Sequence, residues 1–182
     1  MTEKEVLDFI TRRRSVRKFT GDPVPKEKIE ILLKAAMAAP SARNRQPWEF
    51  LVITDREKIR EVCTAHPYAK FGVDAGAVII PLGKPAGNFY FFQDMAAAVE
   101  NLLLAAANLG LGATWCGMDE KRQELLRPIL GIPEDYWIFA VIPVGVPAEN
   151  PPPRTQYDPA KVHWNTSDLS VFTSSASRLS IR

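Results

Sequence analysis

The stretch QDMAAAVENLLLAAANLG, residues 93–110, decides the fold. It is apolar on nearly every side of a helix and ends in glycine, so it predicts a helix over residues 93–109 that stops at Gly110. Its most apolar part, residues 95–107, contains Glu100 and is shorter than the roughly 18 residues needed to span a bilayer. We therefore expect no membrane span, and we expect this helix to be buried on several sides, at a subunit interface.

Helical and strand patterns are interspersed on both sides of this stretch. Helices are predicted from Glu3 into the arginines that follow residue 11, around Ile29, Leu32, Leu33 and Ala36 up to a stop at Pro40, after Asp55, and from Asp119 to near Gly131. Strands are predicted at WEFLVIT (48–54), GAVIIPL (76–82), GATWCG (112–117) and YWIFAVIPVGV (136–146), the last being the longest. No linker divides the first 150 of the 182 residues, and a proline-rich arm starts at Pro147. One domain with an arm is the simplest description.

Charge is nearly balanced along the chain, with 23 basic and 21 acidic residues and a net charge of +2. This balance gives no general electrostatic case for a nucleic-acid partner. Residues 12–18, however, carry five positive charges with no acid among them, which indicates either an anion site at a helix end or a solvated basic face. The N-terminus lacks a basic segment followed by an apolar one, so we expect a cytoplasmic protein.

Familiar catalytic and metal-binding motifs are missing from the sequence. His66 and His163 have no partner at ligand spacing, and Cys63 and Cys116 lie 53 positions apart without a CxxC pair. GLGATW misses the dinucleotide fingerprint because Trp115 stands where its third glycine belongs. We therefore expect no catalytic side chain and no metal site. The sequence instead favours a set of anion and amide contacts that hold a cofactor with its own chemistry.

Four blocks of sequence together resemble the nitroreductase family of FMN-dependent oxidoreductases, in its short subfamily. They are RRRSVRKF (12–19), PSARNRQPWEF (40–50), QDMAAAVENLLLAA (93–106) and GLGATWCG (110–117). With the strand IFAVIPVGVPAE and the arm PPPRTQYDPAKVHW, they cover most of residues 5–164 in the family's order. The resemblance implies an α+β fold: a sandwich of a mainly antiparallel sheet flanked by helices, built as an intertwined homodimer with FMN at the interface. The domain would span residues 1–164 including the arm, and the tail 165–182 stays unassigned.

The basic segment would hold one end of the cofactor. The resemblance implies that Arg13 and Ser15 contact the phosphate and ribityl chain, with Arg14 contributing main chain or side chain. Arg17 would lie at the pyrimidine edge of the flavin, where a positive charge stabilises the reduced form. Arg154, after the prolines, resembles a further phosphate contact, although a solvent-exposed charge would give the same pattern.

The other two cofactor segments are a loop and a strand. The resemblance implies that the loop residues Pro40, Ser41, Ala42, Asn44 and Gln46 reach the same flavin from the other subunit, although Ser, Asn and Pro are also ordinary turn residues. Trp115, Cys116 and Gly117 match the stretch whose backbone N–H faces flavin N5. We expect Cys116 to be an inert buried thiol, since it lies in an apolar run with no base beside it.

The resemblance also implies an activity. NAD(P)H would deliver hydride to the flavin and leave, and a nitroaromatic, quinone or similar electron-poor small molecule would then take the electrons in a ping-pong reaction. Specialised flavin chemistry, such as reductive dehalogenation or flavin fragmentation, remains an alternative on the same fold. A non-catalytic flavin-binding dimer is another, and the basic cluster leaves a weak nucleic-acid hypothesis that binding assays would separate. The sequence does not specify the preferred nicotinamide.

Overall fold

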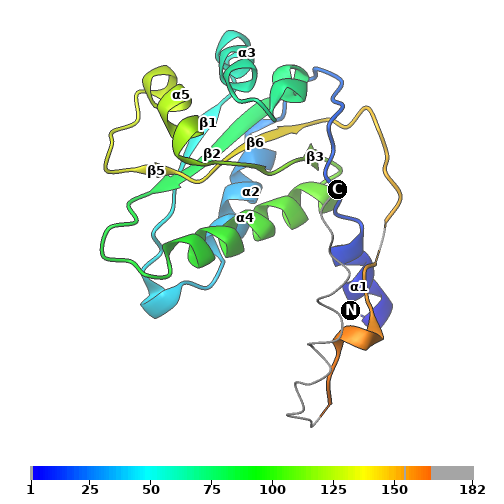
Figure 1. The fold of residues 1–182 in the computed structure, drawn as a ribbon. Coiled ribbons are helices and arrows are strands. Elements are labelled where there is room, and N and C mark those ends of the chain that lie inside the picture. The colour runs from blue at the N-terminus through cyan, green and yellow to red at the C-terminus, as the bar shows by residue number, and fades with distance from the viewer. Residues whose placement is uncertain (1, 154, 165–182) are drawn as a thin grey trace, which may run out of the picture.

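A computed structural model of the chain describes residues 2–153 and 155–164 (Figure 1). Its elements in chain order are α1 (Glu3–Thr11), α2 (Lys26–Met37), η1 (Ala42–Asn44), β1 (Glu49–Ile53), α3 (Arg56–Ala65), η2 (Lys70–Asp74), β2 (Ala77–Gly83), α4 (Phe91–Asn108), β3 (Gly112–Ala113), β4 (Cys116–Gly117), α5 (Glu120–Leu130), β5 (Trp137–Ile138), β6 (Ala140–Gly145) and η3 (Pro159–Lys161). Polar residues begin several helices as expected. The side chain of Asp55 accepts a hydrogen bond from the backbone of Lys58, and Asp119 does the same for Arg122.

The strands form one sheet in which the paired strands of the described chain run antiparallel. Its order is β1-β2-β6-β3, with β5 also pairing with β2 and β4 also pairing with β6. The prediction that residues 136–146 form the longest strand is wrong. The pairing breaks at Phe139, between β5 and β6, and β2 is longer, with seven residues. Period-two alternation alone does not reveal this break, because the apolar pattern continues through it.

Helices cover both faces of the sheet. Because successive strand residues point to opposite faces, Ala77 and Ile79 of β2 join a core with α2 and α4, whereas Val78 and Ile80 join a second core with α3 and α5. The α+β sandwich predicted from the sequence is therefore confirmed. No helix in the described part of the chain is long and apolar enough to cross a membrane.

Helix α4 is the longest helix described, and it ends where its sequence predicts. Its last residue is Asn108, and Gly110 has a φ of +72°, which favours glycine. Met95, Leu102 and other large side chains of one face are buried against the sheet and α2.

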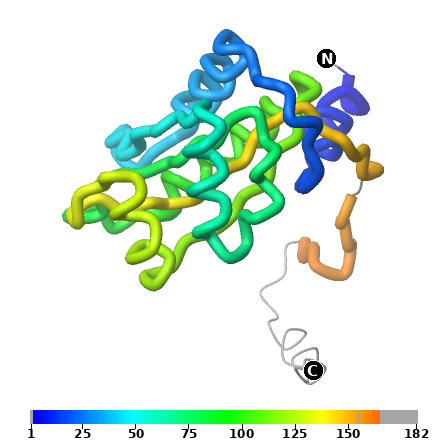
Figure 2. Tube along the Cα trace, turned by 90° about the horizontal axis from the view of Figure 1, so that it is seen from above, coloured from blue at the N-terminus to red at the C-terminus, as the bar shows by residue number. Residues whose placement is uncertain are grey.

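Helix α1 and the C-terminal arm project from one end of this body (Figures 1 and 2). No residue of α1 is buried, and Leu7 and Ile10 are 62% and 51% exposed. The arm begins beside the N-terminal segment, where the Ala148 N–H donates to the Lys18 carbonyl at 2.8 Å and Phe19 bridges to Pro147. The tail 165–182 lies outside the described residues.

Candidate functional site

The basic segment runs alongside the strand residues that follow α4. Ser15 bridges in parallel to Ala113, and the backbone N–H of Val16 donates to the Ala113 carbonyl at 3.1 Å. The Thr114 hydroxyl donates back to the Val16 carbonyl at 2.6 Å and is almost completely buried. A Cβ at Gly112 would lie 2.5 Å from Val16, so only glycine allows this approach. The structure thus brings the segment that holds Arg13–Arg17 next to residues 112–114.

The basic segment forms an ion pair and hydrogen bonds with groups near the surface. The Nε of Arg13 lies 3.3 Å from Oε1 of Glu100 on α4, and Arg14 donates to the Pro152 carbonyl of the arm. The backbone N–H of Arg17 donates to the Glu149 carboxylate at 2.6 Å. The sequence did not predict Glu100 and Glu149 as partners of the basic segment. The position of Glu100, an acid within an apolar run, could have indicated the first of them. The Arg13 side chain is 32% exposed and Arg17 is exposed, so the Arg13–Glu100 pair contributes little to stability and both side chains are partly open to an anion.

The Arg17 side chain lies near residues 115–117. Its guanidinium carbon is 5.9 Å from the centre of the Phe71 ring, and its charge lowers the pKa of Cys116. Burial dominates, however, and raises the pKa of the Cys116 thiol to about 11. Burial, followed by the neighbouring Cys116, likewise raises the pKa of Cys63 to about 12. Both cysteines are therefore protonated, buried thiols at neutral pH, and the predicted burial of Cys116 is confirmed.

Trp115 and Gly117 flank Cys116 in different environments. The Trp115 ring is partly buried, with its centre 5.3 Å from that of Phe139. Gly117 is exposed, and a Cβ added there would meet no atom within 4 Å. The backbone at Gly117 is therefore open to a flat ligand, which fits the role expected of it.

The loop of residues 40–46 has a strained backbone. Arg43, Asn44 and Gln46 have φ angles of 55°, 53° and 47°, in the left-handed region that non-glycine residues rarely adopt. Within the loop, the Gln46 backbone N–H donates to Ser41 Oγ at 3.0 Å, and the Gln46 amide donates to Asn44 Oδ1 at 2.9 Å. Such strain persists only where the surroundings impose it, and it is common at ligand sites.

A buried carboxylate holds the loop in place. Asp94, in the first turn of α4, is only 5% exposed and accepts a hydrogen bond from the Ala42 N–H at 2.9 Å. Its other oxygen lies 3.5 Å from the Asn88 amide. Sequence reasoning missed Asp94, although a lone acid at the start of an apolar helix could have indicated it. Next to the loop, a pocket of about 150 Å³ opens towards residues 87–90, where Phe89 is 86% exposed.

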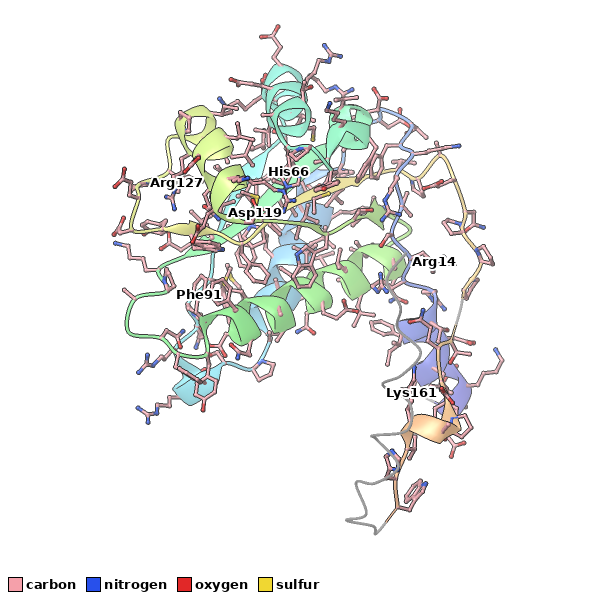
Figure 3. The ribbon with its side chains drawn as sticks, viewed as in Figure 1. Arg14, His66, Phe91, Asp119, Arg127 and Lys161 are labelled. Atoms are coloured by element: carbon pink, nitrogen blue, oxygen red, sulfur yellow. The ribbon has the colours of Figure 1, made fainter. Side chains whose placement is uncertain are left out.

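The structure places the two groups of residues that the sequence predicts to bind a cofactor apart within one chain. Arg14 lies at the opposite end of α4 from Phe91, the helix end that carries the Asp94 anchor (Figure 3). The 18 residues of α4 make it about 27 Å long. Residues 13–17 and 112–117 therefore form one group, and the loop 40–46 forms a second. Arg154 lies outside the described residues.

Comparison with known proteins identifies relatives of the whole fold. The family model described as "Nitroreductase family" matches residues 10–69 and 64–146. The chain is 42% identical over 170 residues to a Methanothermobacter thermautotrophicus protein named "Putative NADH dehydrogenase/NAD(P)H nitroreductase", covering 90% of this chain and 88% of that protein. It is also 28% identical over 180 residues to an "Iodotyrosine deiodinase" from Haliscomenobacter hydrossis, covering 80% of each.

Solved structures share the fold at similar coverage. An "FMN-dependent Nitroreductase" from Clostridium difficile R20291 superposes with a TM-score of 0.82 at 29% identity, covering 88% of this chain and 99% of that one. A "putative nitroreductase in complex with fmn" from Desulfovibrio desulfuricans gives a TM-score of 0.77 at 32% identity, covering 86% and 94%.

Proposed function

The chain belongs to the nitroreductase family, and we propose that it is an FMN-dependent oxidoreductase that passes hydride from NAD(P)H to an electron-poor acceptor. Nitroaromatics and quinones are the acceptors that we propose, in a ping-pong reaction in which donor and acceptor occupy the same place in turn. Bound FMN supplies the atom that accepts and releases hydride, so that no side chain has to carry electrons.

One observation carries this proposal. The basic segment lies against residues 112–114, and the charge of its exposed Arg17 acts on Cys116, next to the open backbone at Gly117. This donor set fits a ligand that is anionic at one end and flat and polar at the other. The FMN bound in the related Desulfovibrio desulfuricans structure has this chemistry.

Each group of the basic segment then has a task. Arg13, Arg14 and Ser15 bind the phosphate and the sugar chain, with the guanidinium groups as bidentate donors. Arg17 lies near the redox edge and stabilises negative charge there by Coulomb attraction. The backbone of Trp115, Cys116 and Gly117 presents N–H groups to the same edge. Arg154 is a further phosphate contact in this proposal.

We propose that the site is completed by a second copy of the chain. The loop residues Pro40, Ser41, Ala42, Asn44 and Gln46 lie near the end of α4 that is opposite Arg14, so in this proposal they serve the partner's cofactor. The exposed apolar side chains of α1 and the projecting arm support this proposal, because such surfaces are buried in obligate dimers.

The cofactor is tested directly on purified protein. We expect a yellow preparation with flavin absorption that bleaches on anaerobic mixing with NADH or NADPH and recovers its colour with a nitroaromatic or a quinone. A colourless protein that cannot be reconstituted with FMN, or a bound flavin that both nicotinamides leave oxidised, would overturn the proposal.

Sharing of the site between subunits is tested by mixing two defective variants. Arg13→Ala and Gln46→Ala damage opposite halves of a shared site. Mixed dimers formed by joint refolding should therefore contain one intact site and, at limiting FMN, show more activity than either variant alone. Absence of any recovery, with mixed dimers verified by mass spectrometry, would contradict a shared site.

A second candidate function is reductive dehalogenation. The 28% identity to an iodotyrosine deiodinase over 80% of the chain favours it. A dehalogenase should be slow with every nitro and quinone acceptor and should release halide from a halogenated aromatic. Comparison of steady-state turnover with both classes of substrate decides between the two functions.

A further inference from the structure

His66 is a buried histidine to which the proposed reaction assigns no role. It caps the C-terminus of α3, and its side chain is fully buried. Nδ1 accepts a hydrogen bond from the backbone N–H of Tyr68 at 3.2 Å, and Nε2 lies 3.1 Å from the carbonyl oxygen of Gly117. A backbone N–H can only donate, so Nδ1 carries no proton. The ring is therefore neutral, with its proton on Nε2, which donates to Gly117.

A second hydrogen bond joins the same two stretches of chain. The Sγ of Cys116 lies 3.4 Å from the carbonyl oxygen of Tyr68, and since the thiol stays protonated it is the donor. From α5, Arg122 reaches the Gly117 carbonyl at 3.4 Å and lies 4.8 Å from the centre of the Tyr68 ring. We call His66, Tyr68, Cys116, Gly117 and Arg122 the His66 clamp. The clamp holds Cys116–Gly117 at two points, the Cys116 thiol and the Gly117 carbonyl.

The clamp acts on strand residues with little other support. β4 has only two residues, which pair on one side with Val141 and Ala140 of β6. His66 and Asp119 lie near each other on the face of the sheet opposite α4 (Figure 3). The orientation of the Cys116–Gly117 backbone therefore depends on the clamp as well as on β6.

We propose that His66 is a positioning residue, whose neutral ring holds the Cys116–Gly117 backbone in the orientation that receives the redox edge of the flavin. This inference rests on the proposed function. It assigns His66 no contact with cofactor or substrate, because the ring acts through the Gly117 carbonyl. If Nδ1 were protonated, its N–H and the backbone N–H of Tyr68 would face each other as two donors. The hydrogen bond between His66 and Tyr68 would then be lost.

The surroundings of His66 favour its neutral form. Burial is the largest effect and lowers the pKa of His66, and the charge of Arg122 acts in the same direction, whereas the Gly117 carbonyl and Asp119 oppose it. The unfolded chain therefore takes up this proton at a higher pH than the folded protein does. The resulting stabilisation is complete above pH 6.5, the ordinary pKa, and is lost as the pH falls below it.

The test compares His66→Phe with His66→Gln in the FMN-loaded protein. Phenylalanine keeps the ring volume but makes no hydrogen bond, whereas glutamine can donate to Gly117 and does not titrate. We expect His66→Phe to weaken FMN binding about tenfold at pH 7.5, the effect of losing one buried hydrogen bond. His66→Gln should recover most of this affinity. Between pH 7.5 and 5.5, FMN affinity should fall in the wild type and stay flatter in His66→Gln.

The possible outcomes distinguish failure of the proposed function from failure of the role proposed for His66. Wild-type protein that binds no FMN refutes the proposed function. Wild-type protein that binds FMN while His66→Phe matches its affinity and pH profile overturns only the role of His66, even if that variant unfolds more easily. A third measurement needs no flavin and no core substitution: nitrogen NMR of the His163→Gln protein should show His66 neutral with its proton on Nε2. A proton on Nδ1 at pH 7 would overturn the clamp.

Discussion

Two regions of this molecule are proposed to bind FMN, one to its own cofactor and one to the partner's, yet they keep their shapes by different means. The basic segment is ordinary extended backbone laid along β3; its Arg13 side chain pairs with Glu100 at the surface, and the backbone N–H of Arg17 donates to the Glu149 carboxylate. The loop 40–46 has three residues with left-handed φ angles and depends on the buried carboxylate of Asp94. One region is held by strand pairing, the other by a buried polar anchor.

This difference determines where each region is vulnerable. Pairing along a strand tolerates changes of side chain but not of backbone spacing, so its weak point is the close approach at Gly112. A strained loop is destabilised when its buried anchor is removed, because the hydrogen-bond donors that the anchor satisfied are left without a partner. Substitutions at the two sites therefore test whether the proposed site is built from both regions.

The largest effect is expected from Gly112→Val. A Cβ there would lie 2.5 Å from Val16, so β3 and the basic segment must separate, at about 3 kcal/mol of stability. FMN binding should be lost as well. Gly117→Ala is the matched control, because its Cβ meets no protein atom within 4 Å. Its unfolding midpoint in urea should stay near that of the wild type while FMN affinity falls. Equal midpoints for both variants would contradict the close approach.

The next effect in size is expected from Asp94→Ala. This change removes the acceptor of the Ala42 N–H and leaves Asn88 without it, which costs about 2 kcal/mol of unfolding free energy. The loop should then exchange its amide hydrogens faster, while the basic segment keeps its protection. Asp94→Asn retains an acceptor oxygen and should lose less than half as much. Slow exchange throughout the loop of Asp94→Ala would show that other contacts hold it.

The sequence predicted some features of this structure and missed others. The helices and the C-terminal end of α4 followed from periodicity and capping residues, and the sandwich followed from the family resemblance that the four blocks carry; the site residues that the resemblance implies stay a prediction. The anchor at Asp94 and the His66 clamp did not, because each depends on hydrogen bonds between stretches that are far apart in sequence, such as His66 and Gly117. The break at Phe139 was missed because strand pairing, rather than local pattern, decides it.

Arg13→Ala should have a smaller effect on the free energy of unfolding, although it should weaken FMN binding strongly. The Arg13–Glu100 pair is exposed, so its loss should change the unfolding free energy by less than about 1 kcal/mol. Loss of a charged contact to phosphate should weaken FMN binding about tenfold or more. Glu100→Gln breaks the same ion pair and leaves Arg13 free for phosphate, so calorimetry should show undiminished affinity. A parallel loss in both variants would mean that the ion pair, and not the arginine, matters.

The smallest effect is expected from Arg43→Gly, and it has the opposite sign. Arg43 has φ 55° and ψ 26°, a conformation that glycine adopts without strain. Relief of this strain stabilises the folded state slightly more than the added flexibility of glycine stabilises the unfolded chain. The free energy of unfolding should therefore rise by about 0.5 kcal/mol. Arg43→Ala, which keeps the strain, should show no such gain. If the strained loop is shaped for a ligand, the glycine variant should bind FMN more weakly than the alanine variant despite being more stable. Equal FMN affinities would show that the left-handed backbone at Arg43 serves the fold alone.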